Sequence, residues 1–164
     1  MPKEPKPPFI IWCDTHEQAP PPFPDGCLLE RVTMSEGDYT SPDCQGVGVI
    51  ERKSVRDFAA SIAQGRERLD DEVRRLRDYR WKCIVIEGEI LDVPRAAMIH
   101  PHAVLGTIAS FWARSDLPCL FAGNPSGAGR LMAGILRRWA ERLASEAAGC
   151  EARASAVRAD PVSE

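Results

Sequence analysis

Short apolar runs bounded by turn-forming residues recur along this chain, and each of them predicts a β-strand. The proline-rich stretch at residues 18–26 cannot form a helix or a central strand, so it predicts a loop. Residues 39–53 join two strand segments through turn chemistry at 41–46, which predicts a hairpin. The expected strands cover residues 9–13, 27–34, 37–40, 47–53, 83–87 and 118–122.

Segments with apolar residues at helical spacing follow the early strands. Ser54, with Asp57 three residues later, has the pattern of a capping box, so a helix is expected to begin there. Further helices are expected at about residues 67–80, 101–115 and 125–148. This order predicts an α/β fold with a central mixed sheet flanked by helices, antiparallel at the start of the chain and parallel later. It indicates one domain at residues 9–148, between a flexible tail at 1–8 and a disordered tail at 149–164.

Composition and charge narrow the class of protein. A chain of 164 residues suits one domain, and a net charge of -3 excludes a protein that coats nucleic acid through bulk positive charge, although it allows a local basic groove. The sequence holds no apolar run of membrane-spanning length and no signal-peptide core, so we expect a cytoplasmic protein, nucleoid-associated in a prokaryote, without membrane contacts. Its six cysteines lack zinc-ribbon spacing and are expected to be reduced.

Candidate chemistry gathers at the early strands. Side chains alternate along a strand, so Glu51 and Lys53 share one face and Arg52 lies on the other. If Asp38 lies on the paired strand of the hairpin, its carboxylate approaches Glu51, and two such carboxylates repel unless a cation or a proton lies between them. Mg²⁺ suits that geometry because it prefers oxygen ligands. The ammonium of Lys53 would then face the same cavity, where it could orient a water molecule or neutralise charge on a phosphate.

The spacing of these residues resembles a known motif. Asp38, twelve residues and then Glu51-x-Lys53 is the pattern of the PD-(D/E)xK nucleases, and over roughly residues 9–140 the chain strongly resembles the nuclease domain of XPF-type structure-specific endonucleases. The segment at residues 14–17, Asp-Thr-His-Glu, is similar to the family's Asp-[Ser/Thr]-Arg-Glu. The family hallmark is GD, a variable stretch, ERK, three residues and D, and here it consists of Gly37, Asp38, Glu51, Arg52, Lys53 and Asp57.

The resemblance implies a restriction-endonuclease-like fold and a metal-dependent endonuclease that cuts flapped, forked or otherwise branched DNA in repair, recombination or replication. It implies that Asp38 and Glu51, with Asp14, hold Mg²⁺ or Mn²⁺, and that Lys53 lies beside the attacking water. Glu17 would complete the acidic cluster.

Further roles also follow from the resemblance. Arg52 and Asp57 would support the site through an ion pair, and Arg66 would lie near the scissile phosphate. His16 replaces the family arginine, and a neutral imidazole cannot replace a guanidinium that pairs with phosphate or carboxylate. Arg74 and Arg77 are candidate DNA contacts, although acidic residues interleave with them, and a solvated, salt-bridged helix face is the simpler interpretation.

Two other functions stay open. One is a non-catalytic DNA-binding partner subunit, but such subunits lose the acidic residues that this chain keeps. The other is a Holliday-junction resolvase or restriction-like nuclease, which the sequence does not separate from a flap-cutting enzyme. Apolar stripes in residues 101–115 and 125–145, with Trp112 and Trp139, predict a homodimer through these two helices with the acidic sites facing outward.

Overall fold

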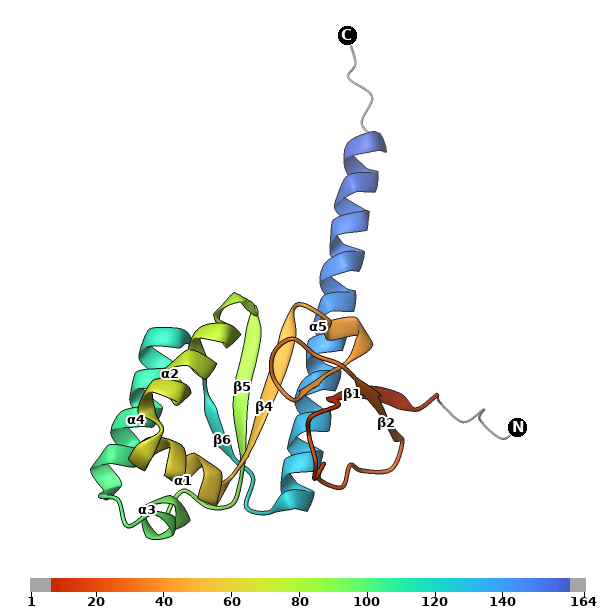
Figure 1. The fold of residues 1–164 in the computed structure, drawn as a ribbon. Coiled ribbons are helices and arrows are strands. Elements are labelled where there is room, and N and C mark those ends of the chain that lie inside the picture. Colours follow the sequence, from red (N-terminus) through yellow and green to blue (C-terminus); the bar gives the residue numbers. More distant parts are fainter. Residues whose placement is uncertain (1–6, 160–164) are drawn as a thin grey trace.

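The computed structural model describes residues 7–159, with the backbone alone for Arg66 and for residues 154–159. A six-stranded sheet forms its centre, in the order β2-β1-β3-β4-β5-β6 (Figure 1). The strands are β1 (Phe9–Asp14), β2 (Cys27–Val32), β3 (Tyr39–Thr40), β4 (Gly48–Ser54), β5 (Trp81–Glu87) and β6 (Cys119–Phe121).

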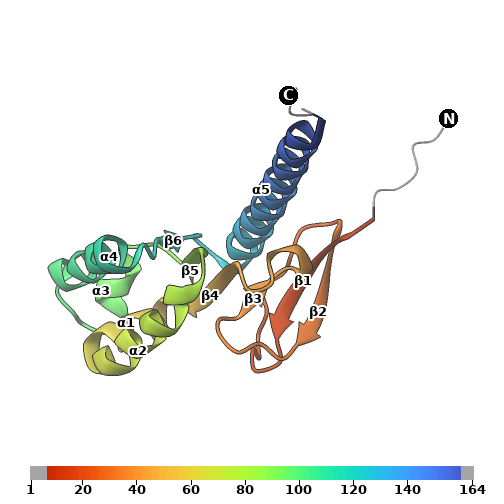
Figure 2. The same cartoon turned by 90° about the horizontal axis from the view of Figure 1, so that it is seen from above.

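Helices cover both faces of this sheet. The α-helices are α1 (Val55–Gln64), α2 (Arg66–Arg75), α3 (Asp92–Ala96), α4 (Pro101–Ser115) and α5 (Pro125–Ala159), and the short 3-10 helices are η1 (Pro42–Cys44) and η2 (Leu76–Asp78). Helices α1 to α4 lie on one side of the sheet and α5 lies on the other (Figure 2). The predicted α/β class with a mixed central sheet is therefore confirmed.

Two hydrophobic clusters follow this layering. Phe58, Leu69 and Ile84 belong to the cluster between the sheet and α1–α4. Ile50 and Leu136 belong to the cluster beneath α5. Successive residues of β4 and β5 point to opposite faces, and residues 48–50 and 83–86 are all buried, so both faces are covered at the centre of the sheet.

The pairing of the first two strands differs from the expected antiparallel start. β1 and β2 run parallel, with Phe9 opposite Cys27, and β1 pairs antiparallel with β3 instead. The proline-rich loop after β1 is long enough to carry the chain back along the strand, which a parallel connection requires. β2 therefore becomes an edge strand, and the end of β1 lies beside β3.

The predicted hairpin is confirmed, and it leads directly into α1. β3 and β4 pair antiparallel, with Tyr39 opposite Ile50. Ser54 caps α1 as expected, because its side chain accepts a hydrogen bond from the backbone N–H of Asp57 at 3.0 Å. The last residues of β4 therefore stand at the junction of sheet and helix.

The expected end of the last helix at residue 148 is wrong, because α5 continues to Ala159. The segment after residue 143 is rich in alanine, the strongest helix former, and a single Gly149 in a helix costs only about 1 kcal/mol. The tail predicted at 149–164 is thus helical as far as Ala159. Residues 160–164 and 1–6 lie outside the described residues. Between residues 7 and 159, no helix combines the length and apolarity needed to cross a bilayer.

Candidate active site

A cleft of about 740 Å³ opens beside the second half of β4. Its walls come from the loop after β1, Asp38 just before β3, residues 51–54 of β4, and one face each of α1 and α2. Of the residues that the sequence singled out, the cleft is lined by His16, Glu17, Asp38, Glu51, Arg52, Lys53 and Asp57.

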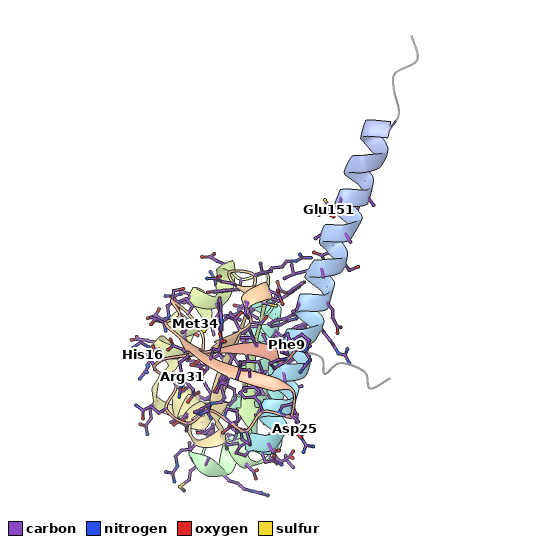
Figure 3. The ribbon with its side chains drawn as sticks, turned by 90° about the vertical axis from the view of Figure 1, so that its right-hand side faces the viewer. Phe9, His16, Asp25, Arg31, Met34 and Glu151 are labelled. Carbon is purple, nitrogen blue, oxygen red and sulfur yellow. The ribbon has the colours of Figure 1, made fainter. Side chains whose placement is uncertain are left out.

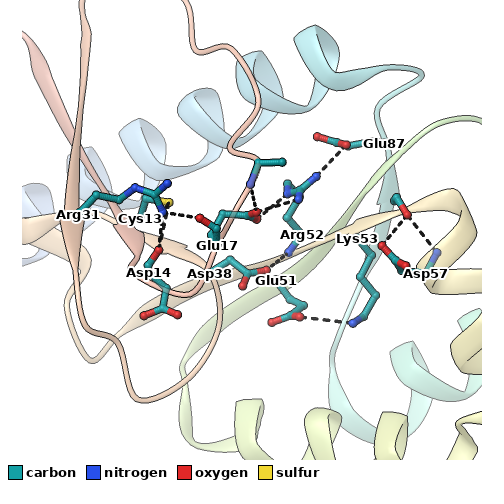
Figure 4. Close-up of polar contacts among 12 residues, drawn as sticks. Cys13, Asp14, Glu17, Arg31, Asp38, Glu51, Arg52, Lys53, Asp57 and Glu87 are labelled. Atoms are coloured by element: carbon teal, nitrogen blue, oxygen red, sulfur yellow. Dashed lines mark hydrogen bonds and ion pairs between the residues drawn. The ribbon is translucent and has the colours of Figure 1, made fainter.

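Backbone geometry fixes the position of Asp38. Gly37 has a φ of +70°, and a Cβ atom there would lie 2.3 Å from a methyl group of Val49, so only glycine fits. The backbone N–H of Asp38 donates to the Ile50 carbonyl at 2.9 Å. The Asp38 carboxylate accepts a hydrogen bond of 2.7 Å from the backbone N–H of Arg52. This carboxylate is thereby held against β4, one residue from Glu51 (Figure 4).

Glu51 and Lys53 share one face of β4, as the alternation predicted, and both are largely buried. Lys53 Nζ lies 3.4 Å from Glu51 Oε1 and 2.9 Å from Oε1 of Glu72, which reaches in from α2. The ammonium therefore joins a carboxylate from the sheet to one from a helix.

The electrostatics of this group are those of crowded carboxylates. Burial, with the nearby Glu17 carboxylate, raises the pKa of Asp38 to about 6. Burial, then Asp38 and Glu72, raises the pKa of Glu51 to about 9. Although burial opposes it, contact with Glu51 and Lys53 keeps the pKa of Glu72 below its ordinary value. Glu51 is therefore the carboxyl group of this set whose pKa is raised furthest above its ordinary value.

Arg52 points to the opposite side of β4 and is clamped between two carboxylates. Its guanidinium makes a bidentate contact with Glu17, at 2.7 and 2.9 Å, and a 2.8 Å contact with Glu87 at the end of β5 (Figure 4). Although burial lowers it, the contacts with Glu17 and Glu87 raise the pKa of Arg52 above its ordinary value. The clamp ties the loop after β1 to β4 and β5.

Asp57 does not join this clamp, so the expected supporting ion pair between Arg52 and Asp57 is wrong. Asp57 accepts a 2.7 Å hydrogen bond from the Ser54 hydroxyl and so takes part in the cap of α1. The physical reason is its place in the first turn of that helix, where its carboxylate meets the capping side chain.

The backbone N–H of Asp14, at the end of β1, donates to the Asp38 carbonyl at 2.8 Å, but Asp14 does not line the cleft. Its carboxylate accepts hydrogen bonds from the Met34 backbone at 2.9 Å and from the His16 backbone at 3.1 Å, and it contacts the His16 ring at 2.9 Å. Figure 3 shows His16 and Met34 at one edge of the molecule, and His16 is 84% exposed. Within residues 7–159, no three acidic, histidine or cysteine side chains form a group ready to hold a metal ion. Of the three expected ligands, Asp38 and Glu51 line the cleft, and the Asp14 carboxylate is held beside it by Met34 and His16.

The arginines singled out for DNA contact are dispersed. Arg74 pairs with Asp71 at 2.8 Å on the surface of α2. Arg77 borders a small hollow between α2 and α4, together with Arg74 and Arg114. The side chain of Arg66 lies outside the described residues. Arg68, which the sequence reasoning missed, lines the cleft itself.

Glu72, Glu87 and Arg68 are the site residues that the sequence did not single out. Gly65, Arg68 and Glu72 follow one another at helical spacing, and all three line the cleft. That spacing is a signal that the sequence offered for one face of α2. Glu87 carried no such signal, because it meets Arg52 only through the parallel pairing of β4 and β5.

Comparison with known proteins places this geometry in a family. The family model of the ERCC4 domain matches residues 4–135. A structure of XPF from Aeropyrum pernix is 23% identical with a TM-score of 0.66, and the match covers 77% of this chain and 64% of that chain. A second structure, of XPF from Aeropyrum pernix in complex with DNA, is 24% identical with a TM-score of 0.67. That match covers 82% of this chain and 66% of that chain. This chain thus spans just under two thirds of their length. A search of curated proteins found no match.

The mixed sheet and its flanking helices have the architecture of the restriction-endonuclease-like fold. The chain belongs to the ERCC4 domain family, and its fold is that of the XPF-type nuclease domain.

Proposed function

We propose that this protein is a divalent-metal-dependent endonuclease that hydrolyses phosphodiester bonds in branched DNA. The observation that carries the proposal is the convergence of Asp38, Glu51 and Lys53 at one cleft in a chain of the ERCC4 family. The retained acidic pair favours an enzyme over a non-catalytic DNA-binding subunit. A relative of the same fold in complex with DNA supports DNA as the substrate.

The donor set of the cleft fits a hard cation. Asp38 and Glu51 offer carboxylate oxygens on neighbouring strands, and the pKa of each is raised by burial and by other carboxylates, so positive charge between them is favoured. Mg²⁺ or Mn²⁺ held there would supply Lewis-acid stabilisation of charge on the phosphate. Asp14, the last residue of β1, is a third candidate ligand, although hydrogen bonds from the Met34 and His16 backbone occupy its carboxylate.

Lys53 has the properties of an orienting cation. Although burial lowers it, Glu51 and Glu72 raise the pKa of Lys53 above its ordinary value, so the side chain stays an ammonium and does not serve as a base. As a donor of three hydrogen bonds it can hold the attacking water and stabilise charge that develops on the phosphate. Arg68, at the rim of the same cleft, is placed to contact a neighbouring phosphate of the strand.

We also propose a homodimer that pairs through α4. Leu105 and Trp112 are 54% and 60% exposed on this helix, and Met98 is exposed just before it. The stripe on α5 that was expected to share the interface is used within the chain, because Trp139 stacks on Trp81 at 5.8 Å and covers Gly48. None of the described residues that line the cleft belongs to α4, so pairing through α4 leaves the cleft open.

A cleavage panel tests the proposed activity. Labelled flap, fork, four-way junction and plain duplex DNA are incubated with the wild-type protein and with Asp38→Asn and Glu51→Gln, in Mg²⁺, in Mn²⁺ and in EDTA. We expect cleavage of branched substrates that needs the cation and falls by about 100-fold or more in both variants. Asp43→Asn, an exposed acid on η1, is the matched control and keeps full activity.

Two results would contradict the proposal. Cleavage by Asp38→Asn at the wild-type rate would show that the hairpin carboxylates are not the site. Equal cleavage of plain duplex and branched DNA would replace the structure-specific enzyme with a restriction-like one.

A further inference from the structure

We infer that Glu72 is the positioning residue of this site: its carboxylate on α2 holds the Lys53 ammonium at a fixed place beside Glu51. The inference deepens the proposed function and rests on it. Glu72 lies outside the family hallmark, which ends at Asp57, and it enters the site from a different element.

The contacts single out Glu72. Lys53 Nζ lies 2.9 Å from Glu72 and 3.4 Å from Glu51, so the shorter of its two contacts is with the helix. The side chains of Lys53 and Glu72 are only 11% and 20% exposed. Among the described residues that line the cleft, Glu72 is the one acidic side chain that α2 contributes. Asp71, its neighbour on α2, is instead exposed and paired with Arg74.

A lysine needs such a partner to act at a defined point. Its four-carbon stem rotates freely, and ordering it costs up to about 2 kcal/mol of side-chain entropy. Glu51 alone cannot define the place of the ammonium, because both residues project from the same face of one strand. The Glu72 carboxylate on α2 forms a triangle across the cleft with Glu51 and the Lys53 ammonium. Because the ammonium then contacts two acceptors from different elements, its position is defined.

The contact with Glu72 also keeps a carboxylate oxygen of Glu51 free to bind a cation. Without the Glu72 charge, the ammonium has Glu51 as its one remaining carboxylate partner among the contacts described above. It would then close onto the oxygen that a cation needs, and it would leave the place from which it orients water. The loss therefore falls on turnover and spares DNA binding, which phosphate contacts outside this triangle provide.

The test compares Glu72→Gln with Asp71→Asn. Both variants remove one negative charge from adjacent positions of α2, but only Glu72 contacts Lys53. With branched DNA and Mg²⁺, we expect kcat to fall about 10- to 100-fold in Glu72→Gln while KM for DNA stays within about twofold. Asp71→Asn keeps both constants. In a Lys53→Ala background, Glu72→Gln should cause no further loss, because the two residues act as one unit.

A second readout needs no cleavage. The wild-type protein and both variants are treated briefly with an amine-reactive reagent, and labelling of the Lys53 peptide is measured by mass spectrometry. We expect Lys53 to be protected in the wild type and in Asp71→Asn, and to be labelled several-fold faster in Glu72→Gln. If Glu72→Gln does not fold by circular dichroism, Glu72→Asp, which is too short to keep the 2.9 Å contact, takes its place.

The two readouts distinguish failure of the proposed function from failure of the positioning role of Glu72. If the wild-type protein cuts no DNA, the proposed function fails, while the labelling still decides whether Glu72 holds Lys53. If Lys53 is labelled equally in all three proteins, or if Asp71→Asn loses as much kcat as Glu72→Gln, the positioning role is overturned.

Discussion

Glu51 is the residue in which the proposed function and the stability of the fold oppose each other most directly. It lies largely buried between Asp38 and Glu72, and burial raises its pKa to about 9. A folded-state pKa above the unfolded value means that the native protein binds the proton more tightly. The stability that the folded protein gains from protonated Glu51 is therefore fully present below about pH 4.5. It is lost as the pH rises toward 9.

Glu51→Gln should consequently stabilise the protein in the absence of divalent cations. Glutamine resembles the protonated side chain at every pH, so the gain over the wild type should grow between pH 5 and pH 8, by about 1 kcal/mol per pH unit. Thermal unfolding in EDTA at both pH values measures it. Glu141→Gln, at an exposed position of α5, is the control and should show no gain that grows with pH. A Glu51→Gln protein less stable than the wild type at pH 8 would contradict the expectation.

At the residue scale, the sequence predicted which side chains meet at the cleft better than it predicted the residues that they contact. Alternation along β4 put Glu51 and Lys53 together and Arg52 opposite, and the structure has this arrangement. The partners Glu72 and Glu87 were missed because they arrive from α2 and β5, and their contacts depend on how helix and strand pack. A nearby acid, Asp57, was assigned to Arg52 instead, although its helix cap satisfies it locally.

The hairpin of β3 and β4 is the element that brings the site together, and Gly37 is its tightest point. Its positive φ disfavours any other residue, and Val49 fills the space that a side chain would need. Gly46 has a similar φ of +72° at the other end of the same hairpin, but nothing lies within 4 Å of its missing Cβ. A comparison of substitutions at the two positions therefore separates the effect of backbone strain from that of steric exclusion.

Gly37→Ala should cost more stability and more activity than Gly46→Ala. The positive φ costs about 1–2 kcal/mol in both variants, and the contact with Val49 adds about 1–3 kcal/mol in Gly37→Ala alone. Because Asp38 follows Gly37, we also expect kcat to fall by about 100-fold there, as a shift near 1 Å can cause. Urea unfolding and cleavage assays measure both effects. Equal losses in the two variants would show that the steric contact is relieved without moving Asp38.

At the element scale, local signals predicted most helices and strands but not how the first strands pair. Turn chemistry at 41–46 fixed the hairpin, and Ser54 fixed the start of α1. The parallel pairing of β1 with β2 depends on the path of a proline-rich loop, for which the sequence carries no periodic signal. The length of α5 was underestimated because Gly149 and the small residues after it suggested a tail, whereas alanine sustains the helix.

The whole molecule places its candidate active site and the exposed apolar side chains of α4 on different elements. The cleft lies beside β4, α1 and α2, whereas Leu105 and Trp112 stand on α4. On the other face of the sheet, α5 covers the core and its far end, near Glu151, projects from the body (Figure 3). The sequence could not divide its two apolar stripes between core and surface, because each alone suits either role.

The homodimer proposed through α4 is testable at this scale. A stable pair of this kind buries about 1,200–2,000 Å² in total, and large apolar side chains at its centre carry most of the binding free energy. Light scattering at micromolar concentration should therefore give twice the mass of the chain, and Trp112→Glu should give the monomer because it buries a charge in that centre. Leu28→Glu introduces the same charge at an exposed apolar residue of the edge strand β2, away from α4, and should leave the mass doubled. A wild-type monomer, or a Trp112→Glu protein that keeps the doubled mass, would show that α4 is not the interface.

Because α4 contributes no described residue to the cleft, Trp112→Glu should weaken junction binding, which needs both copies. It should lower the rate of cutting at saturating DNA by less.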